Sequence, residues 1–308
     1  GLFEFLNINS IVFSQPAEPY RSIIEYLAET SGGTIFPSDC ETRTFLHDLP
    51  VSFKFSLESI ISALEKRKSV IIPDHGIVTY GTVSMEQAYV TFSSVCFACF
   101  VKFFSDYLFD IKHGKINNKR QNLFDLIVKK LEPAPCFQGS LMKGPFDSEL
   151  RVYQAILEAG MLTVKHRLVD SYFGNISFCY NNTLYISQTG SSLDNLQGVI
   201  DPCPLDGSSC TAITASSELP AHLKIVKHTG NKAILHGHPK FSVILSMDCD
   251  IEKCECRGQC HMKCPHERFV GNIPIVSGEV GSGPHGLCNT VPRAIKGRPG
   301  VIVYGHGI

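Results

Sequence analysis

The chain has 308 residues, 44% of them hydrophobic and 19% charged, so it is long enough to form two globular domains with buried cores. Its net charge of -1 produces no overall field that would attract nucleic acid or acidic lipid, and we expect neither nucleic acid nor membrane as a partner. The thirteen cysteines are odd in number and no signal peptide precedes them, which argues against a secreted disulfide framework and predicts a reducing, cytoplasmic compartment.

The first part of the chain contains two strand signals and one long apolar segment. Ile11–Pro16 is a strand that ends at a proline where a helix can begin, and residues 69–77, SVIIPDHGI, form a β-branched strand that runs into a His-Gly turn. The most apolar stretch, Val90–Leu108, is interrupted by polar and charged residues, so we expect a buried helix and no membrane span. Cys96 and Cys99 on this helix are predicted to be small core residues.

The middle of the chain has the composition of a linker. Lys115–Gln121 is polar and Glu132–Pro145 is rich in proline and glycine, which predicts loops and a domain boundary near residues 135–147. We therefore expect one domain over residues 1–135 and a second over residues 146–308.

The second domain alternates helix and strand signals. An amphipathic helix, Ser148–Leu157, is predicted to end at Gly160. Strands at Gly174–Tyr180 and Thr183–Gln188 are separated by an Asn-Asn pair that suits a hairpin turn. A helix at residues 219–228 then precedes a strand at residues 232–235. This alternation predicts a layered α/β domain.

Two segments of the first domain recur in the second. Residues 300–308, GVIVYGHGI, parallel the SVIIPDHGI segment, and Ile234–Pro239 parallels Ile11–Pro16. Because an internal repeat can decide the fold, we expect the first domain to be a partial copy of the second. No counterpart of the helix that starts near Met85 follows Ile308, so we also expect the second copy to be truncated there.

Three histidines are candidate ligands of one divalent metal. His236 and His238 lie two residues apart on a predicted strand, so both side chains point to the same face of the sheet. His306, in the turn after another strand, supplies a third ligand if the two strands are neighbours, and a fourth position then stays open for substrate. A bare His-x-His motif, taken alone, is more typical of a surface turn.

Three polar motifs are candidates for binding an anion. The motif SSE at residues 216–218 lies at the start of a helix, where hydroxyl and backbone N–H groups bind anions and a carboxylate beside a metal can move protons. Taken alone, SSE is typical of an ordinary helix cap. The motifs TGSS at 189–192 and GNIS at 174–177 offer further donors, although each is also an acceptable turn.

The order of the motifs, GNIS, TGSS, SSE, HGHP and GHG, resembles the class II aldolase and adducin head-domain family, in particular its fuculose-phosphate aldolase-like members. The resemblance covers about residues 150–308 and, more weakly, 1–110. It implies a layered α/β/α domain with a central, mainly antiparallel sheet. It implies that Glu218 is the catalytic acid/base and that zinc or another divalent metal is bound by His236, His238 and His306. It implies that the following residues hold a substrate phosphate: Gly174, Asn175, Thr189, Gly190, Ser216 and Ser217.

The function implied by this resemblance is that of a metal-dependent lyase of the aldolase type. Such an enzyme cleaves a small phosphorylated keto-sugar through a metal-stabilised enediolate and is expected to be a homo-oligomer. An epimerase or dehydratase of the same family is one alternative, although an Asp usually stands at the position of Glu218 in the pentulose-phosphate epimerase branch. A non-catalytic, adducin-like assembly module is the other.

The sequence departs from the family pattern at two places. Phe13 and Gln15 stand where the second domain has His236 and His238, so the first domain is expected to be a degenerate, structural copy. The second departure is a cysteine-rich insertion over residues 249–266, which suggests a redox or metal sensor as a third function. A structural zinc or an iron–sulfur cluster is predicted there. Its first-choice ligands are Cys254, Cys256, Cys260 and Cys264, with Cys249 and Cys288 as substitutes and disulfides as the alternative.

Overall fold

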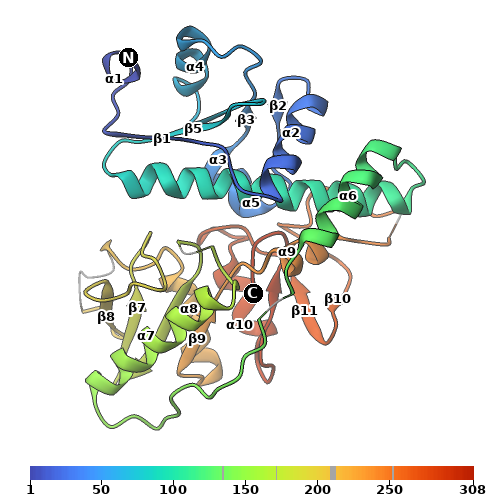
Figure 1. The fold of residues 1–308 in the computed structure, drawn as a ribbon. Helices are drawn as coiled ribbons and strands as arrows, with labels where there is room; N and C mark the ends of the chain where they lie inside the picture. Colours follow the sequence, from blue (N-terminus) through green and yellow to red (C-terminus); the bar gives the residue numbers. More distant parts are fainter. Residues whose placement is uncertain (134, 171, 209–212, 252) are drawn as a thin grey trace. The chain divides into compact units, whose positions relative to one another are not determined.

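The structure is a computed structural model that covers residues 1–308 and describes residues 1–133, 135–170, 172–208, 213–251 and 253–308. The chain forms two compact units, Gly1–Glu132 (unit 1) and Pro133–Ile308 (unit 2), which Figure 1 shows with their elements. The observed division lies a few residues before the predicted boundary near 135–147. Residues 133–147 therefore belong to unit 2.

Unit 1 is built on a three-stranded antiparallel sheet in the order β1, β5, β4. Its strands are β1 (Ser10–Ser14), β2 (Thr34–Ile35), β3 (Leu49–Pro50), β4 (Ser69–Ile72) and β5 (Gly76–Gly81). Its helices are α1 (Leu2–Phe5), α2 (Tyr20–Thr30), α3 (Cys40–Leu46), α4 (Leu57–Leu64), α5 (Met85–Lys112) and α6 (Asn118–Lys130). The central strand β5 is buried along almost its whole length, as a strand covered on both faces is.

Helix α5 is the core helix of unit 1 and runs along the sheet in Figure 1. Cys96, Cys99 and Phe103 on this helix are at most 7% exposed, which confirms the predicted buried helix and its core cysteines. By length and hydropathy alone α5 is apolar enough to cross a membrane, contrary to the sequence prediction, but 67% of its most apolar 18-residue window is buried inside the fold. This burial is that expected of a core helix.

Helix α6 corrects the prediction that Lys115–Gln121 is a linker. The side chain of Asn117 caps the helix by accepting a hydrogen bond of 2.8 Å from the Arg120 N–H. The Arg120 guanidinium donates to the Tyr26 hydroxyl at 3.0 Å and pairs with Asp110. The polar composition of this segment is therefore that of a capped surface helix.

Unit 2 contains a four-stranded antiparallel sheet in the order β8, β7, β6, β9. Its strands are β6 (Asn175–Tyr180), β7 (Thr183–Ser187), β8 (Ile200–Pro204) and β9 (Ala233–His236). The predicted hairpin between β6 and β7 is confirmed, because Asn181 and Asn182 adopt positive φ angles of 46° and 59°.

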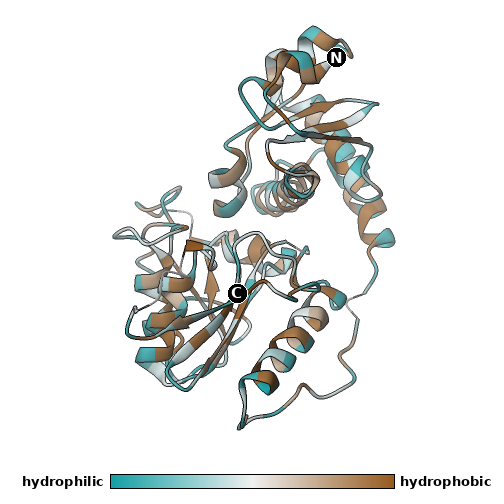
Figure 2. Cartoon of the chain, turned by 90° about the vertical axis from the view of Figure 1, so that its left-hand side faces the viewer, coloured by the Kyte–Doolittle hydropathy of each residue, from teal (hydrophilic) through white to brown (hydrophobic). Residues whose placement is uncertain are grey.

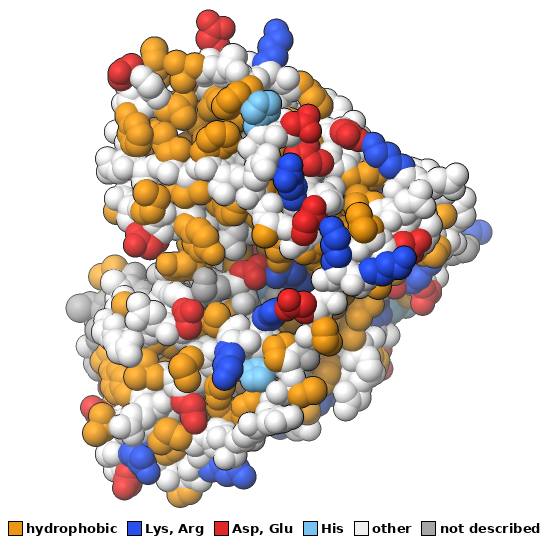
Figure 3. Space-filling model, in the orientation of Figure 1, with side chains coloured by type: hydrophobic (Ala, Val, Ile, Leu, Met, Phe, Trp, Pro, Cys, Tyr) orange, Lys and Arg blue, Asp and Glu red, His pale blue; other side chains and the backbone are white. Residues whose placement is uncertain are grey.

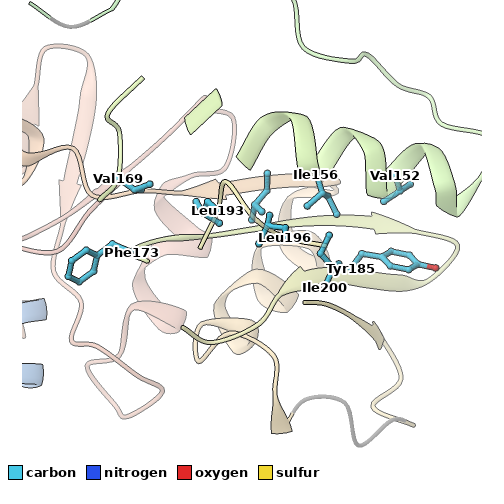
Figure 4. Close-up of a cluster of buried hydrophobic side chains, with 9 residues drawn as sticks. Val152, Ile156, Val169, Phe173, Tyr185, Leu193, Leu196 and Ile200 are labelled. Carbon is cyan, nitrogen blue, oxygen red and sulfur yellow. The ribbon is translucent and has the colours of Figure 1, made fainter. Parts of the chain in front are cut away.

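Helices pack on both faces of this sheet. Figure 4 shows Val152 and Ile156 of α7 (Glu149–Lys165) beside Tyr185 and Ile200 of the sheet. Hydrophobic and hydrophilic stretches alternate along α7 in Figure 2. On the other face, a second cluster joins β7 to α8 (Leu219–Thr229). The site described below lies where α8 begins.

The predicted end of α7 at Gly160 is wrong, since the helix continues to Lys165. A Cβ atom at Gly160 would lie 2.3 Å from the carbonyl oxygen of Leu193. This glycine allows the helix to pass close to a neighbouring loop, and it does not terminate the helix.

A second, smaller sheet of unit 2 follows in the order β10, β11, β12. Its strands are β10 (Arg268–Val270), β11 (Ile273–Val276) and β12 (Ile302–Val303), and the helices of this part are α9 (Lys240–Met247) and α10 (Leu287–Ala294). Strands β10 and β11 are antiparallel, whereas β11 and β12 are parallel.

The two units have similar orders of elements and a shared pattern of strand pairing. The order β1, α2, β2, α3, β3, α4, β4 of unit 1 differs from the order β9, α9, β10, β11, α10, β12 of unit 2 in one element type, the additional helix α3 between β2 and β3. Both β2 with β3 and β10 with β11 are antiparallel. A parallel bridge from Val51, just after β3, to Ile71 in β4 matches the parallel pairing of β11 with β12.

The surface of the chain carries charges of both signs. On the face that Figure 3 shows, acidic and basic side chains are interspersed, with hydrophobic side chains between them. This distribution agrees with the net charge of -1.

Candidate metal centre

The three predicted histidine ligands converge in unit 2. His236 ends β9, His238 follows two residues later, and His306 lies in the turn after β12. One ring nitrogen of each lies within 4.8 Å of the other two. The three side chains are 9%, 4% and 1% exposed, respectively. Three imidazoles this close together in a buried site form a typical donor set for zinc.

The convergence depends on a close approach of two backbone segments. Gly237 and Ile308 exchange two backbone hydrogen bonds of 2.9 Å and 3.0 Å, which holds the end of β9 against the turn that carries His306. A Cβ atom at Gly307 would lie 2.5 Å from the Gly237 carbonyl oxygen and 2.7 Å from Cε1 of His236. Only glycine fits at this position, which explains the His-Gly sequence of the turn.

Two of the histidines are held in a form that binds a metal. Nδ1 of His236 lies 3.0 Å from the carbonyl oxygen of Ile308. Since a carbonyl oxygen only accepts, Nδ1 carries the proton and Nε2 is left with its lone pair. Burial and the neighbouring His236 and His306 lower the pKa of His238 well below its usual value, so its ring is neutral at pH 7. The fixed tautomer of His236 and the neutral ring of His238 fit a divalent cation.

Glu218 lies against this cluster. It is the N-cap residue of α8, and its carboxylate oxygens lie 3.2 Å from Nε2 of His306 and 3.5 Å from Nε2 of His236. The Asn175 amide donates to the same carboxylate at 3.0 Å. Burial by itself raises the pKa of Glu218, but the two histidines and the hydrogen bonds from His306 and Asn175 outweigh it and hold the pKa well below its usual range.

A buried pair that the sequence reading missed lies beside Glu218. His222 is one helical turn beyond Glu218 on α8, and its Nδ1 lies 2.7 Å from the hydroxyl oxygen of Ser177 on β6. Burial lowers the pKa of His222 to about 4. The signal in the sequence is the i, i+4 spacing from Glu218, which puts both side chains on one face of the helix.

The predicted phosphate-binding residues lie at the same end of the sheet as the histidines. Asn175 is paired with His236 across β6 and β9, and a Cβ atom at Gly174 would lie 2.4 Å from the His236 carbonyl oxygen. At the same end, Ser187, two residues before Thr189, accepts from the Ile176 N–H on its hydroxyl at 3.2 Å and from the Ser216 N–H on its carbonyl at 3.0 Å. The predicted motifs therefore gather around one end of this sheet.

Some of these residues already have hydrogen-bond partners within the protein. The Thr189 hydroxyl donates to the Ala215 carbonyl at 3.0 Å, and the Ser216 hydroxyl accepts from the Glu218 N–H at 3.3 Å. Ser217 is exposed, and a Cβ atom at Gly190 would meet nothing within 4 Å. Ser217 and the backbone at Gly190 are thus the accessible members of the set.

The structure does not bring the cysteine-rich insertion together as a second metal centre. Among the described residues, the three histidines are the one group of three or more His, Cys, Asp or Glu side chains whose ligand atoms gather closely enough for a metal ion. Cys254 and Cys256 are free thiols, and Cys260 and Cys264 donate weakly to the carbonyl oxygens of Cys256 and His266. The disulfide alternative is not formed by these cysteines either.

Comparison with known proteins agrees with the motif order. The model of the class II aldolase and adducin N-terminal domain matches residues 154–308, while no curated protein matches the chain. The L-fuculose-1-phosphate aldolase of Thermus thermophilus is similar in structure, with 23% identity, a TM-score of 0.41, and 52% of this chain and 77% of that chain covered. YgbL of Klebsiella pneumoniae, assigned provisionally as an aldolase, epimerase or decarboxylase, is similar at 20% identity and a TM-score of 0.39, with 53% and 78% covered.

Proposed function

We propose that this chain, which belongs to the class II aldolase and adducin N-terminal domain family, is a metal-dependent lyase of the aldolase type acting on a phosphorylated keto-sugar. The observation that carries the proposal is the convergence of His236, His238 and His306 with the carboxylate of Glu218 in a buried site. Family membership supports an activity within the range of aldolases and related enzymes. The site residues supply the proposed chemistry.

The three histidines would hold the divalent ion, zinc being the first choice for three imidazole ligands. When bound, the ion would supply Lewis-acid stabilisation of the negative charge that develops on substrate oxygens during carbon–carbon cleavage. The hydrogen bond from His236 Nδ1 to Ile308 orients that ring toward the ion.

Glu218 is proposed to move the proton at the carbon next to the substrate carbonyl. Its depressed pKa keeps it ionised. In cleavage it would accept the proton of the hydroxyl group whose carbon becomes the aldehyde, while the electron pair of the broken carbon–carbon bond passes to the carbon next to the carbonyl. Glu218 would then donate the proton to that carbon. Asn175 fixes one carboxylate oxygen by donating to it. The low exposure of the Glu218 side chain, 10%, limits competition from water.

The substrate phosphate is proposed to bind at the start of α8 and at the loop after β7. Ser216 and Ser217 supply hydroxyl groups, and the start of α8 supplies a favourable helix dipole. The open backbone at Gly190 can approach an anion closely. Thr189, Gly174 and Asn175 are proposed to shape this end of the site more than to donate to it, because they contact the protein itself.

Unit 1 is proposed to be a degenerate copy that serves packing or assembly. At the positions equivalent to the ligand cluster it has Phe13 and His75, whose ring centroids lie 5.7 Å and 4.4 Å from that of Phe55 in tilted arrangements. The Nδ1 atom of His75 lies 2.9 Å from the Pro73 carbonyl oxygen. One imidazole packed against an aromatic ring supports a structural role for unit 1.

Metal content tests the site directly. We expect wild-type protein to bind about one zinc per chain with ligands of the kind proposed, and His236→Ala to lose that zinc while its circular dichroism is unchanged. His228→Ala, which removes an exposed histidine of α8, is the matched control and should keep its zinc. Unchanged zinc content in His236→Ala would reject the metal site.

Substrate assays distinguish the proposed lyase from its alternatives. Release of dihydroxyacetone phosphate from ketose 1-phosphates indicates an aldolase, whereas a changed stereocentre or loss of water indicates an epimerase or a dehydratase. A zinc-loaded protein that is inactive on all of these but forms a defined homo-oligomer in light scattering would favour the assembly module.

A further inference from the structure

A buried carboxylate lies outside the metal centre, on strand β8. Asp201 is only 6% exposed. Its two oxygens each accept one hydrogen bond, from the Gln188 amide at 2.8 Å and from the Thr214 hydroxyl at 2.6 Å. Both donors are neutral groups. Because a buried charge is costly unless its oxygens are hydrogen-bonded, these two bonds make the carboxylate compatible with this position.

The two donors belong to two segments that are far apart in the sequence. Gln188 belongs to residues 187–190 at the end of β7, and Thr214 belongs to residues 214–217 ahead of α8. Most of the proposed phosphate-binding residues lie in these two segments: Thr189, Gly190, Ser216 and Ser217. The β8 carboxylate therefore bonds to both segments from a third place in the chain.

The backbone pairing between the two segments is short. The Ser216 N–H donates to the Ser187 carbonyl at 3.0 Å, and these hydrogen bonds enclose one isolated antiparallel bridge. The Thr189 N–H donates to the Thr214 carbonyl, also at 3.0 Å. Next to this pairing the space is open, since a Cβ atom at Gly190 meets nothing within 4 Å. Pairing this short opens easily unless side chains reinforce it.

The carboxylate reinforces this pairing from the neighbouring strand. In the register of β7 with β8, Asp201 is opposite Ile186, so Gln188 is its diagonal neighbour on the same face of the sheet. Thr214 bonds to the same carboxylate from the other segment. Asp201 therefore joins β8, the end of β7 and the segment ahead of α8 at one point.

Another buried hydrogen bond of β7 has a different surrounding and offers a comparison. The Tyr185 hydroxyl donates to Glu149 of α7 at 2.6 Å, and Tyr185 belongs to the apolar cluster that Figure 4 shows. Ile186, the next residue, belongs to the cluster on the α8 side of the sheet. Since neighbouring side chains of a strand point to opposite faces, the Tyr185 bond lies on the face opposite Asp201.

We propose that Asp201 is a positioning residue for the substrate phosphate, which fixes residues 187–190 against residues 214–217 and so holds the donors of both segments ready for the anion. The inference rests on the phosphate site of the proposed function. Donors that are already ordered bind an anion more tightly than donors that must be ordered on binding. Asp201 acts through its two partners, because its own negative charge is unsuited to direct contact with a phosphate.

Binding of inorganic phosphate to the full chain tests this inference. It is measured by isothermal titration calorimetry with and without chelator, which separates phosphate held by the metal. We expect Asp201→Ala to bind phosphate about tenfold more weakly or worse, the effect of losing a hydrogen bond to a charged group. Its zinc content should remain that of wild type, because the three histidines lie on other segments.

Tyr185→Phe is the matched structural control. It removes a buried hydrogen bond from the same strand but from the opposite face. It should lower the melting temperature and keep the phosphate affinity of wild type. A drop in phosphate affinity of equal size in both variants would show a general structural effect and would reject the positioning role.

A second pair of variants keeps the inference testable if Asp201→Ala does not fold. Thr214→Val removes only the hydroxyl group of an exposed residue and should weaken phosphate binding, whereas Thr214→Ser keeps the hydroxyl and should bind as wild type does. Because the hydroxyl acts through the carboxylate, Thr214→Val should add nothing further in the Asp201→Ala background.

The failure of this inference and that of the proposed phosphate site give different results. Wild-type phosphate affinity in folded Asp201→Ala, or in Thr214→Val, would overturn the role of Asp201 and leave the phosphate site in place. A wild-type chain that binds no phosphate in chelator would reject the phosphate site and the role of Asp201 together.

Discussion

Glu218 combines two roles that its sequence motif left as alternatives. SSE at the start of a helix is typical of an ordinary cap, and Glu218 is indeed the N-cap residue of α8. Its carboxylate, however, does not cap the helix but turns to His236, His306 and Asn175. The backbone geometry of a cap and the side-chain chemistry of a reactive group are therefore compatible in one residue.

Replacing Glu218 by Gln separates its chemical role from its structural one. The Glu218→Gln side chain keeps the shape of the carboxylate and one accepting oxygen but does not accept a proton. We expect kcat for cleavage to fall by about 10²- to 10⁴-fold, the usual contribution of a general acid or base. Bound zinc, measured by atomic emission, should remain near the wild-type amount.

Glu267→Gln, at an exposed position of the same unit, is the control for the loss of one negative charge. It should leave both kcat and zinc content unchanged. A Glu218→Gln variant with wild-type kcat would show that another group moves the proton.

The candidate ligands were predictable because they depend on local rules, whereas their neighbours were not. Alternation along a strand puts His236 and His238 on one face, and a His-Gly turn is visible in the sequence. Ser177 and His222 meet only because β6 and α8 pack together. In the cysteine-rich insertion, the sequence suggested a cluster that the structure does not form. Cys254 and Cys264 are close in sequence, but they do not belong to a group of ligand atoms close enough for a metal ion among the described residues.

At the scale of elements, glycines and asparagines predicted turns and helix ends correctly only where the backbone conformation has a local cause. The Asn181-Asn182 turn was predictable because both residues tolerate positive φ. Gly160 was misread, since its reason is the nearby carbonyl of Leu193, which the sequence does not show. The helix α6 was missed because a polar segment followed by an amphipathic one resembles a linker until its Asn117 cap is recognised.

The close approach of β9 and the turn after β12 gives an element-scale prediction. Gly307→Ala puts a methyl group against the Gly237 carbonyl and the His236 ring, so the two segments must separate by a few tenths of an ångström or more. We expect a melting temperature lower by about 2 °C or more, as overpacking costs about 1–3 kcal/mol. Zinc affinity should fall as well, because His236 and His306 lie on the separated segments.

Gly283→Ala is the matched control, since a Cβ atom there meets nothing within 4 Å and its φ angle is not positive. It should retain both the melting temperature and the zinc affinity of the wild type. Equal behaviour of the two alanine variants would contradict the view that this contact holds the histidines together.

At the scale of the whole molecule, the two units carry buried titratable groups with opposite effects on stability. In unit 1, Asp39 caps α3 by accepting from the Thr42 N–H at 2.7 Å, and burial raises its pKa from 3.8 to about 6, against the hydrogen bonds from Thr42. In unit 2, burial lowers the pKa of His222 from 6.5 to about 4. Each group is more stable in its neutral form within the fold.

The signs follow from proton binding. Between pH 4 and 6 the folded state of unit 1 holds the Asp39 proton more tightly than the unfolded state, so the free energy of unfolding falls as the pH rises. Between pH 6.5 and 4 the unfolded state of unit 2 binds the His222 proton more tightly, so the free energy of unfolding falls as the pH falls. Shifts of about two units correspond to about 3 kcal/mol at most for each group.

Two substitutions that abolish titration separate these effects. Asp39→Asn keeps an oxygen that can cap α3, so relative to wild type it should stabilise the chain increasingly as the pH rises from 4 to 6. His222→Asn keeps a group that can bond to Ser177, and relative to wild type it should stabilise the chain increasingly as the pH falls from 6.5 to 4. Exchange of the α3 and α8 peptides, measured in chelator across this range and corrected for intrinsic rates, reports the two units separately. If the stability differences between variant and wild type changed with pH in the same direction for both residues, at least one of the two buried side chains would not be neutral.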